Sequence, residues 1–331
     1  YTMKTRYKNL FWAGVISSVC LNSVGSLEAS SFLYWTESVR DPSFTSTSIM
    51  RSGLDGSNVE VVMTQGTSEN TFGGIAIDSA NGYLYSGTRA ALFRANLDGT
   101  GRIDLVPAIN QVADIDLDLT NGKIYWSEGG SGVNAIYRAN LDGSGKETLL
   151  NIGFAGLLEG IALDVPAGKL YFSRNINAGS DSIEVMNMDG TGVSVIHSLG
   201  SALPNPYDVD LSPDGQKVVW GQYEAPFEGV FQANKDGTGS IETIIATSLD
   251  NGLAIDDSSQ TVFFGGPTSP SGPIQSIGIN GSGFATVVPN RPFVAYLAIA
   301  EIRSVPDTGS TLAYSVVGLG VLGFLRRRSA A

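Results

Sequence analysis

A short segment rich in aromatic residues recurs along the middle of the chain, and this repeat constrains the fold more than any other feature. The first copy reads Tyr34-Trp35-Thr36-Glu37, and the later copies begin at Tyr85, Tyr125, Tyr171, Val219 and Phe263. Successive copies start 40 to 51 residues apart. A period of that length is typical of repeat architectures such as solenoids and propellers.

Two further segments share this period. One contains an Asp-Gly or Asn-Gly pair between apolar runs, which is the strongest short sequence signal for a β-hairpin. Its copies contain Gly56, Gly99, Gly143, Gly190, Gly237 and Gly281. The other alternates apolar with small or polar residues, as a half-buried strand does. Its copies begin at Gly74, Asp114, Gly160, Asp208, Gly252 and Tyr296. Four short strands in each repeat predict a propeller blade, and six copies predict six blades.

The order of the segments predicts how the ring closes. The repeat region starts at a second strand, residues 32–37, and ends at a lone first strand, residues 296–303. We expect the last strand to complete the blade that the first residues begin, because this pairing removes a free sheet edge. The sequence therefore predicts an all-β fold, a six-bladed β-propeller with four-stranded blades, over residues 30–303.

Residues 1–29 have the pattern of a signal peptide for export. Three basic residues precede an apolar stretch, residues 10–21, which is too short to span a membrane as a helix. Cleavage is expected after Ala29. Two alternatives are a lipoprotein signal centred on Cys20 and an N-terminal helix buried in the domain.

Residues 304–331 form a second signal-like segment. It begins with the motif Val305-Pro306-Asp307-Thr308-Gly309. An apolar run, residues 311–325, follows and predicts a short transmembrane helix. The final Arg326-Arg327-Arg328 predicts that this end stays in the cytoplasm and that the propeller lies outside. The alternative is a plain membrane anchor.

Charge and composition exclude several classes of function. The chain has a formal net charge of −12, so it lacks the basic surface that nucleic acid requires. A single Cys excludes a disulfide framework and a cysteine-based zinc site. A single His, His197, excludes sites with several histidines and disfavours a histidine-dependent catalytic triad.

The repeats carry a family resemblance. Tyr34-Trp35-Thr36-Glu37, Tyr125-Trp126-Ser127-Glu128 and Arg138-Ala139-Asn140-Leu141-Asp142-Gly143 resemble the class B repeats of low-density lipoprotein receptors, the Tyr-Trp-Thr-Asp propellers. The resemblance covers roughly residues 31–303. It implies a six-bladed, non-enzymatic module that binds proteins or positions neighbouring domains. The family's fourth motif residue is Asp, and Glu37 and Glu128 stand in its place, so the family's Asp network is not carried over.

The C-terminal segment resembles a sorting signal. It is similar to the PEP-CTERM signals of Gram-negative bacteria, in the variant that reads Val-Pro-Asp-Ser-Gly, with Thr308 in place of Ser. It also resembles the Leu-Pro-any-Thr-Gly signal of sortases, with Val305 in place of Leu. Both resemblances imply an exosortase- or sortase-like transpeptidase that hands the protein to the cell envelope.

Departures from the repeat predict a site on the propeller axis. Acidic or amide residues replace small ones near the start of the first strands of four blades. The predicted set is Asp114, Glu159, Asp208 and Asn251. Oxygen ligands of this kind suit Ca²⁺, and six-bladed lactonases hold a catalytic Ca²⁺ at the axis, which is an analogy of fold alone. The resulting alternative function is a Ca²⁺-dependent hydrolase, lactonase or lyase. A water-filled polar channel is the other interpretation.

A second candidate surface is the face where first strands begin and second strands end. Its predicted side chains are Glu37, Phe72, Arg89, Glu128, Arg174, Tyr207, Tyr223 and Phe293. Exposed aromatic residues ringed by charge suit a contact with a protein or glycan ligand. The sequence therefore predicts an exported, envelope-tethered binding module without catalytic residues.

Overall fold

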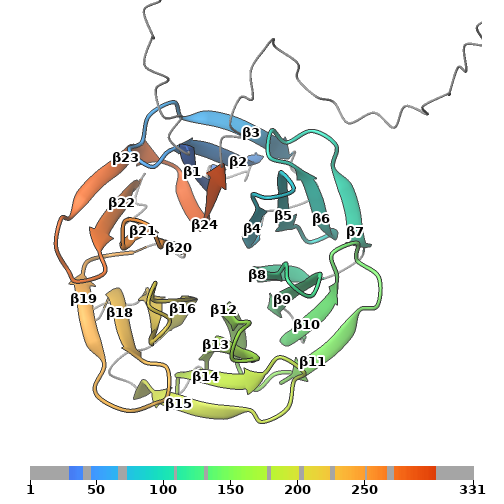
Figure 1. Ribbon diagram of the computed structural model, residues 1–331, viewed down its shortest axis with the longest axis vertical. Coiled ribbons are helices and arrows are strands. Elements are labelled where there is room, and N and C mark those ends of the chain that lie inside the picture. The colour runs from blue at the N-terminus through green and yellow to red at the C-terminus, as the bar shows by residue number, and fades with distance from the viewer. Residues whose placement is uncertain are drawn as a thin grey trace, which may run out of the picture. The chain divides into compact units, whose positions relative to one another are not determined.

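Six four-stranded antiparallel sheets surround a common axis in the computed structural model, as the repeat predicted (Figure 1). The residues that the structure describes are 30–39, 46–65, 73–107, 110–129, 133–176, 180–200, 205–223, 228–249, 252–266 and 272–302. The sheets stand side by side like blades, with the strands β4, β8, β12, β16, β20 and β24 nearest the axis (Figure 1).

Each blade takes its strands in chain order from the axis outward, except the one that closes the ring. The closing blade contains β24 (Phe293–Ile302), β1 (Ser30–Val39), β2 (Ser46–Gly53) and β3 (Glu60–Gln65). The next contains β4 (Ile75–Asp78), β5 (Tyr83–Gly87), β6 (Ala91–Asn96) and β7 (Ile103–Pro107). The third contains β8 (Gln111–Asp118), β9 (Lys123–Gly129), β10 (Ala135–Asn140) and β11 (Glu147–Asn151).

The remaining three blades repeat the pattern. The fourth contains β12 (Leu157–Asp164), β13 (Lys169–Asn175), β14 (Ser182–Asn187) and β15 (Ser194–Ser198). The fifth contains β16 (Pro206–Leu211), β17 (Lys217–Gln222), β18 (Gly229–Asn234) and β19 (Glu242–Ala246). The sixth contains β20 (Leu253–Asp256), β21 (Thr261–Gly265), β22 (Gly272–Gly278) and β23 (Ala285–Arg291).

The predicted closure is confirmed. Strand β24 pairs with β1 in antiparallel register, with Phe32 opposite Ala300 and Trp35 opposite Leu297. On its other side β1 pairs with β2, so the first strand of the chain is the second strand of its blade. The two ends of the repeat region are therefore held together by one ladder of backbone hydrogen bonds. This pairing leaves no unpaired strand edge where the ring closes.

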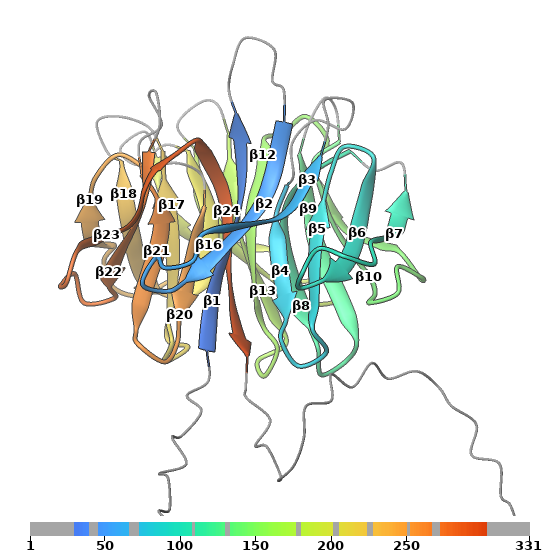
Figure 2. The same cartoon turned by 90° about the horizontal axis from the view of Figure 1, so that it is seen from above.

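Two faces of the ring follow from this topology. Strand β1 begins and β24 ends on the same side, where Ser30 lies opposite Ile302 (Figure 2). We call this side the terminal face. It also carries the β-turns that contain the Asp-Gly pairs, because these join the third and fourth strands of each blade. The opposite side, where all six innermost strands begin, is the distal face.

Large aromatic side chains fill the spaces between the blades. Trp35, Trp126 and Trp220 are fully buried. The Tyr34 hydroxyl donates a hydrogen bond of 3.1 Å to the carbonyl of Leu97, which belongs to the turn of the next blade. The repeated aromatic segment thus forms the packing layer that fixes neighbouring blades against each other.

The Asp-Gly turns also contact the neighbouring blade. In the third blade, Asp142 Oδ1 accepts a hydrogen bond of 2.9 Å from the Ser144 amide, and Gly143 has φ of +82°. A Cβ atom on Gly143 would lie 2.7 Å from the carbonyl carbon of Leu105, which belongs to the outer strand of the preceding blade. Glycine is therefore required here both for its positive φ and for the close approach of two backbones.

The predicted signal peptide, the sorting motif and the C-terminal helix lie outside the described residues. Within the described part of the chain, no helix has the length and apolar character needed to cross a membrane.

Candidate functional site

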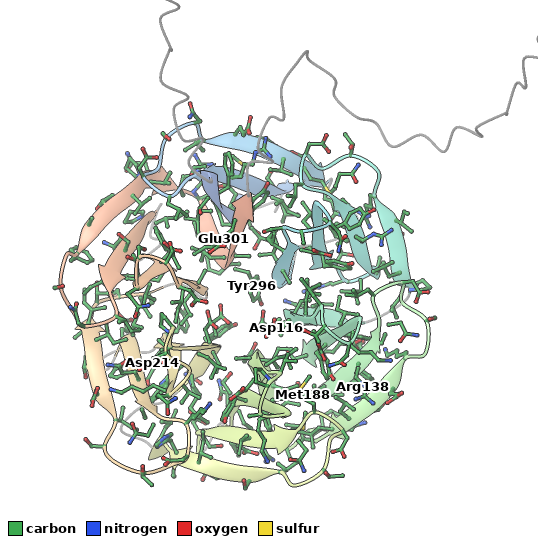
Figure 3. The ribbon with its side chains drawn as sticks, in the orientation of Figure 1. Asp116, Arg138, Met188, Asp214, Tyr296 and Glu301 are labelled. Atoms are coloured by element: carbon green, nitrogen blue, oxygen red, sulfur yellow. The ribbon has the colours of Figure 1, made fainter. Side chains whose placement is uncertain are left out.

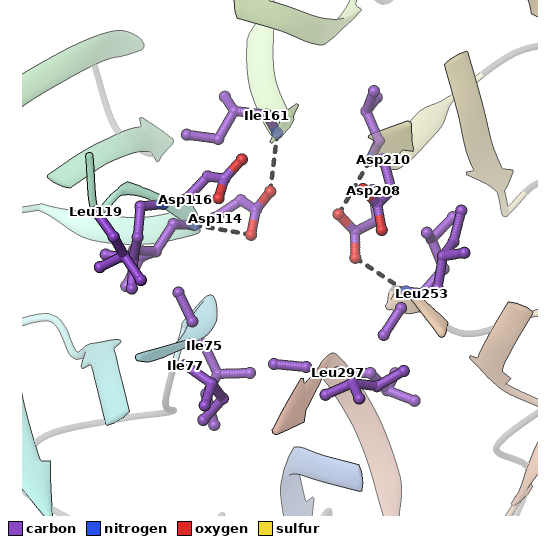
Figure 4. A pocket seen from close by; sticks show the side chains of 18 residues that line it. Ile75, Ile77, Asp114, Asp116, Leu119, Ile161, Asp208, Asp210, Leu253 and Leu297 are labelled. Atoms are coloured by element: carbon purple, nitrogen blue, oxygen red, sulfur yellow. Dashed lines mark hydrogen bonds between the residues drawn. The ribbon is translucent and has the colours of Figure 1, made fainter. Parts of the chain in front are cut away.

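A cavity of about 240 Å³ lies on the axis of the ring (Figure 4). Four aspartates line it, two from β8 and two from β16, on opposite sides of the open space. They are Asp114, Asp116, Asp208 and Asp210. Aliphatic side chains such as Ile75, Leu253 and Leu297 form the rest of the wall. The cavity thus combines carboxylates with an apolar lining.

An alternation of small and large residues explains why carboxylates reach the axis. At one level of the ring, Gly74, Gly160 and Gly252 alternate with Asp114, Asp208 and Tyr296. A Cβ atom on Gly160 would lie 2.6 Å from the Cα of Asp208, and one on Gly252 would lie 2.8 Å from the Cα of Tyr296. Every second inner strand must therefore carry glycine there, and its neighbour in the ring can carry a larger side chain.

The aspartates link neighbouring blades. Asp114 accepts hydrogen bonds of 2.8 Å from the amides of Ile115 in its own strand and Ile161 in the next blade. Asp208 accepts in the same way from Val209 at 3.0 Å and Leu253 at 2.9 Å. An innermost strand is a sheet edge with unpaired amides, so these carboxylates supply the acceptors that the edge lacks.

The second pair of aspartates is less completely satisfied. Asp116 bridges two blades, accepting from Leu117 at 2.6 Å and from Leu163 at 2.8 Å. Asp210 accepts only from Leu211, at 2.7 Å. Among the described residues, nothing donates to its second carboxylate oxygen, so one acceptor of the cavity wall is left over.

Burial raises the pKa of all four carboxyl groups. The pKa of Asp116 rises to about 6 and that of Asp210 to about 8, in both cases chiefly because burial penalises the charged form. Burial also raises the pKa of Asp114, and the facing Asp208 raises it further. The pKa of Asp208 is raised by burial although backbone amides oppose the shift. Near neutral pH the cavity therefore holds protons that exposed aspartates would release.

A second group of polar side chains lies at the inner end of the axis. Tyr296, labelled near the centre of the ring in Figure 3, is only 8% exposed. Burial raises its pKa well above the usual value, and Tyr207, Glu159, Asp114 and Asp208 raise it further. Burial alone raises the pKa of Glu159 to about 7. In the described part of the chain, neither the Tyr296 hydroxyl nor the Glu159 carboxylate has a hydrogen-bond partner.

The residues predicted to bind a metal are therefore only partly brought together. Asp114 and Asp208 line the same cavity, whereas Glu159 is not among the residues that line it and lies close enough to Tyr296 to raise the pKa of that hydroxyl. Asn251 lies outside the described residues. No three His, Cys, Asp or Glu side chains gather in an arrangement that could hold a metal ion among the residues that the structure describes.

Two glutamates predicted on the binding face are buried instead. Glu37 is 7% exposed and Glu128 is 1% exposed. Trp35 Nε1 donates a hydrogen bond of 3.0 Å to Glu37 Oε2. Arg291 Nη2 donates to both carboxylate oxygens of Glu37, at 2.6 Å to Oε1 and 2.8 Å to Oε2. The placement of these glutamates on the surface was wrong because each one follows a tryptophan by two residues and turns back to its indole.

Glu128 repeats this arrangement in the third blade. Trp126 Nε1 donates to Glu128 Oε1 at 2.9 Å, and the Lys146 ammonium lies 3.4 Å from the same oxygen. Lys146 Nζ also lies 3.8 Å from the ring centre of Tyr137. A cation from the connection just before the outer strand β11 therefore covers the tryptophan–glutamate pair, which contributes to the fold rather than to a surface.

The other predicted residues do lie toward the distal face. Arg89 and Tyr223 are exposed, whereas Tyr207 and Phe293 are half-buried, and Phe72 lies outside the described residues. Tyr207 and Tyr223 make an edge-on ring contact at 6.3 Å. Arg174 is half-buried and donates to the carbonyl of Ala155 at 3.0 Å.

One exposed residue was not singled out from the sequence. Phe154 is 88% exposed, the highest value among the large apolar side chains described. It lies between β11 and β12, in a connection from one blade to the next on the distal face. The sequence could have indicated this exposure, because Phe154 stands in a turn-rich connection and no alternating apolar residues surround it.

Comparisons with known proteins give matches both for the C-terminal segment and for the propeller. Residues 304–329 match the VPDSG-CTERM motif, a sorting signal of exported, surface-anchored proteins. The fold is similar to a chain in the crystal structure of a nidogen/laminin complex, with a TM-score of 0.69 and 17% identity over 83% of this chain and 100% of that chain. These values show a shared propeller fold.

Two bacterial structures are also similar. TolB from Acinetobacter baumannii gives a TM-score of 0.66 and 16% identity, covering 82% of this chain and 66% of TolB. A gluconolactonase from Xanthomonas campestris gives 0.55 and 15%, covering 68% of this chain and 78% of the enzyme. At such identities the likeness concerns the fold alone, which hosts several unrelated functions.

Proposed function

We propose that this chain is an exported bacterial envelope protein whose propeller binds a protein or glycan through its distal face. The observation that supports this proposal most directly is the face of the ring on which the last described strand ends. Strand β24 ends at Ile302 on the terminal face, and the VPDSG-CTERM match begins at residue 304. The chain therefore continues into the sorting motif from the face opposite the proposed contact.

The chemistry of the distal face supports this proposal. Phe154 is 88% exposed and Tyr223 is 44% exposed, and the exposed Arg89 lies on the same face. Aromatic residues and arginine are the types enriched where proteins make tight contacts. The similarity to a propeller crystallised in a nidogen/laminin complex agrees with a role in binding.

The C-terminal segment fits the same role. We infer that an exosortase- or sortase-like transpeptidase recognises Val305–Gly309, while residues 311–325 hold the unprocessed chain in the membrane. Removing residues 305–309 should leave the protein in the membrane fraction at its unprocessed mass. A processed, envelope-attached product from that variant would contradict the proposal.

The distal face is tested by sedimentation of the purified protein with cell-envelope fragments. Phe154→Ser should weaken binding by about tenfold, since buried aromatic anchors contribute most at an interface. Phe284→Ser is the matched control, because Phe284 is 50% exposed and lies in the β22–β23 connection on the terminal face. Equal loss of binding in both variants would reject the distal face as the contact.

A second candidate function is a Ca²⁺-dependent hydrolase or lyase. The observation that favours it is the set of carboxylates on the axis, together with the similarity to a gluconolactonase fold. Its test is a Ca²⁺ titration read by thermal melting, followed by assays with lactone and ester substrates. Ca²⁺ should raise the melting temperature and Asp208→Ala should abolish turnover, whereas no shift in millimolar Ca²⁺ would remove this candidate.

A further inference from the structure

We propose that the closing blade controls processing of the C-terminal signal, because the last paired residues of β24 must leave the blade before a transpeptidase can bind Val305. This inference rests on the proposed function, in which such an enzyme recognises Val305–Gly309. It adds an order of events to that function, since release of the strand end precedes the reaction at the signal.

The connection between the propeller and the signal is very short. Strand β24 is still paired at Ile302, which lies opposite Ser30 on the terminal face (Figure 2). Only Arg303 and Ser304 separate Ile302 from Val305, so the fully extended chain places Val305 at most about 11 Å from the ladder. An enzyme that binds the motif as an extended peptide surrounds its backbone and side chains. Such an enzyme would collide with the terminal face of the closed ring.

A hydrogen bond to the neighbouring blade holds this strand end. The Glu301 amide donates to Ser79 Oγ at 3.0 Å, in the turn between β4 and β5. We call this contact the latch. The turns between the first and second strands of the other blades have different residues at that position, namely Leu119, Val165, Pro213 and Asp257. Among the described turns of this kind, the hydroxyl at that position therefore stands beside the one strand that leads to the signal.

The extent of strand release is limited by burial. Glu301 is exposed, whereas Ala300, the next residue inward, is fully buried opposite Phe32. Release of Ile302 and Glu301 therefore leaves the core of the closing blade intact. The last fixed residue is then Ala300, five residues before Val305, and the reach of the chain increases to about 18 Å.

Like charges weaken the closed state of the strand end. Burial raises the pKa of Asp257 in the turn between β20 and β21, and the charges of Asp256 and Glu301 raise it further. Glu301 thus lies close enough to Asp257 for the two carboxylates to repel each other. The latch opposes this repulsion, so its loss should increase the open fraction.

Processing of the full chain by envelope membranes that contain the transpeptidase, followed by mass spectrometry, tests the latch. Ser79→Ala should raise the processing rate about fivefold, since it removes one ordinary hydrogen bond from the closed state. Ser258→Ala is the matched control, because Ser258 lies in the β20–β21 turn and its hydroxyl donates to Asp256. The control should be processed like the parent chain. Equal rates for the two variants would contradict the latch.

A reversible disulfide tests whether strand release is required. Ser31 lies opposite Glu301, whose amide donates to Ser79 rather than to β1. In such a non-hydrogen-bonded pair the Cα atoms are about 4.5 Å apart, which suits a disulfide. Ser31→Cys combined with Glu301→Cys should reduce processing at least about tenfold when oxidised, and reduction should restore it. The parent chain should be processed at the same rate in both conditions.

A longer connection separates the length of the chain from other effects of the disulfide. Inserting Gly-Ser-Gly-Ser between Ser304 and Val305 should restore processing of the oxidised variant, because the added residues supply the reach that the ladder withholds. Equal rates for the oxidised and reduced forms, or no rescue by the insertion, would overturn this inference alone. Absence of processing in the parent chain would instead reject the recognition of Val305–Gly309, and this inference with it.

Discussion

Glycine at the Asp-Gly turns shows how a single residue serves both local and long-range structure. The sequence predicted these turns and their need for positive φ, because Asp-Gly between apolar runs is a local signal. The close approach of Gly143 to Leu105 could not be predicted, since it depends on how far neighbouring blades are rotated against each other. Glycine here therefore limits the spacing between blades as well as the turn.

The substitution Gly143→Ala should destabilise the protein by about 3 kcal/mol, because it adds a steric clash to the cost of positive φ. Gly122→Ala is the matched control. Gly122 has φ of +66°, but a Cβ atom there would meet nothing within 4 Å. The control should lose only about 1 kcal/mol. Urea unfolding measures both values, and equal losses would show that the turn does not press against its neighbour.

At the level of strands, the closing blade is held by more than its backbone ladder. Arg291 at the end of β23 forms a two-pronged ion pair with Glu37 in β1, and the Trp35 indole donates to the same carboxylate. This contact joins the last complete blade to the blade that closes the ring. It connects residues 254 positions apart in the sequence.

The substitution Glu37→Gln should cost about 3 kcal/mol of unfolding free energy, because it leaves the mostly buried Arg291 guanidinium without its countercharge. Glu60→Gln provides the comparison, since Glu60 pairs with Arg51 but its side chain is 53% exposed. That change should cost less than about 1 kcal/mol. If chemical denaturation gives the same loss for both, the Arg291 pair does not stabilise the closure.

The repeat made the strands and their order predictable, but not the fate of their end residues. Glu37 and Glu128 lie near the end of the second strand of their blades, where the alternation of side chains is compatible with a surface position. Their burial depends on Arg291 and Lys146, which come from the outer strand region of the blades. A cation so distant in the sequence cannot be assigned to a partner from the local pattern alone.

Over the whole molecule, the axial acids couple stability to pH. The pKa values of Asp116, Asp210 and Glu159 rise to about 6, 8 and 7, and burial also raises those of Asp114 and Asp208. The native state therefore binds more protons than the unfolded chain between the ordinary carboxyl pKa and about pH 8. The stability that these protonated acids contribute is fully present below that pH window and is lost as the pH rises through it.

Unfolding free energy should accordingly fall by several kcal/mol between pH 5 and pH 8, since each raised pKa unit corresponds to about 1.4 kcal/mol. The turn aspartates, such as Asp98 and Asp142, have pKa values lowered by hydrogen bonds from Thr100 and Ser144. They therefore affect the pH dependence of stability only below pH 5. Asp210→Asn should flatten the dependence because Asn does not titrate. Urea unfolding across this pH range tests the idea, and stability that rises toward pH 8 would refute it.

Part of the axial site could be predicted from the sequence. Asp114 and Asp208 stand where other repeats have glycine, and that departure correctly placed them on the axis. The alternation of glycine with larger residues was also readable, with Tyr296 as its third large member. The hydrogen bonds that Asp114 and Asp208 accept from Ile161 and Leu253 could not be predicted, because they depend on the gap between the inner strands of adjacent blades.

Closure of the ring by β1 and β24 is the central claim, since the axial cavity and both faces depend on it. Native-state hydrogen exchange followed by mass spectrometry tests it most directly. Peptides covering β1 and β24 should be protected as strongly as those covering β9 and β13, and should open only with global unfolding. Rapid exchange of β24 while β9 and β13 stay protected would show that the ring is not closed in this way.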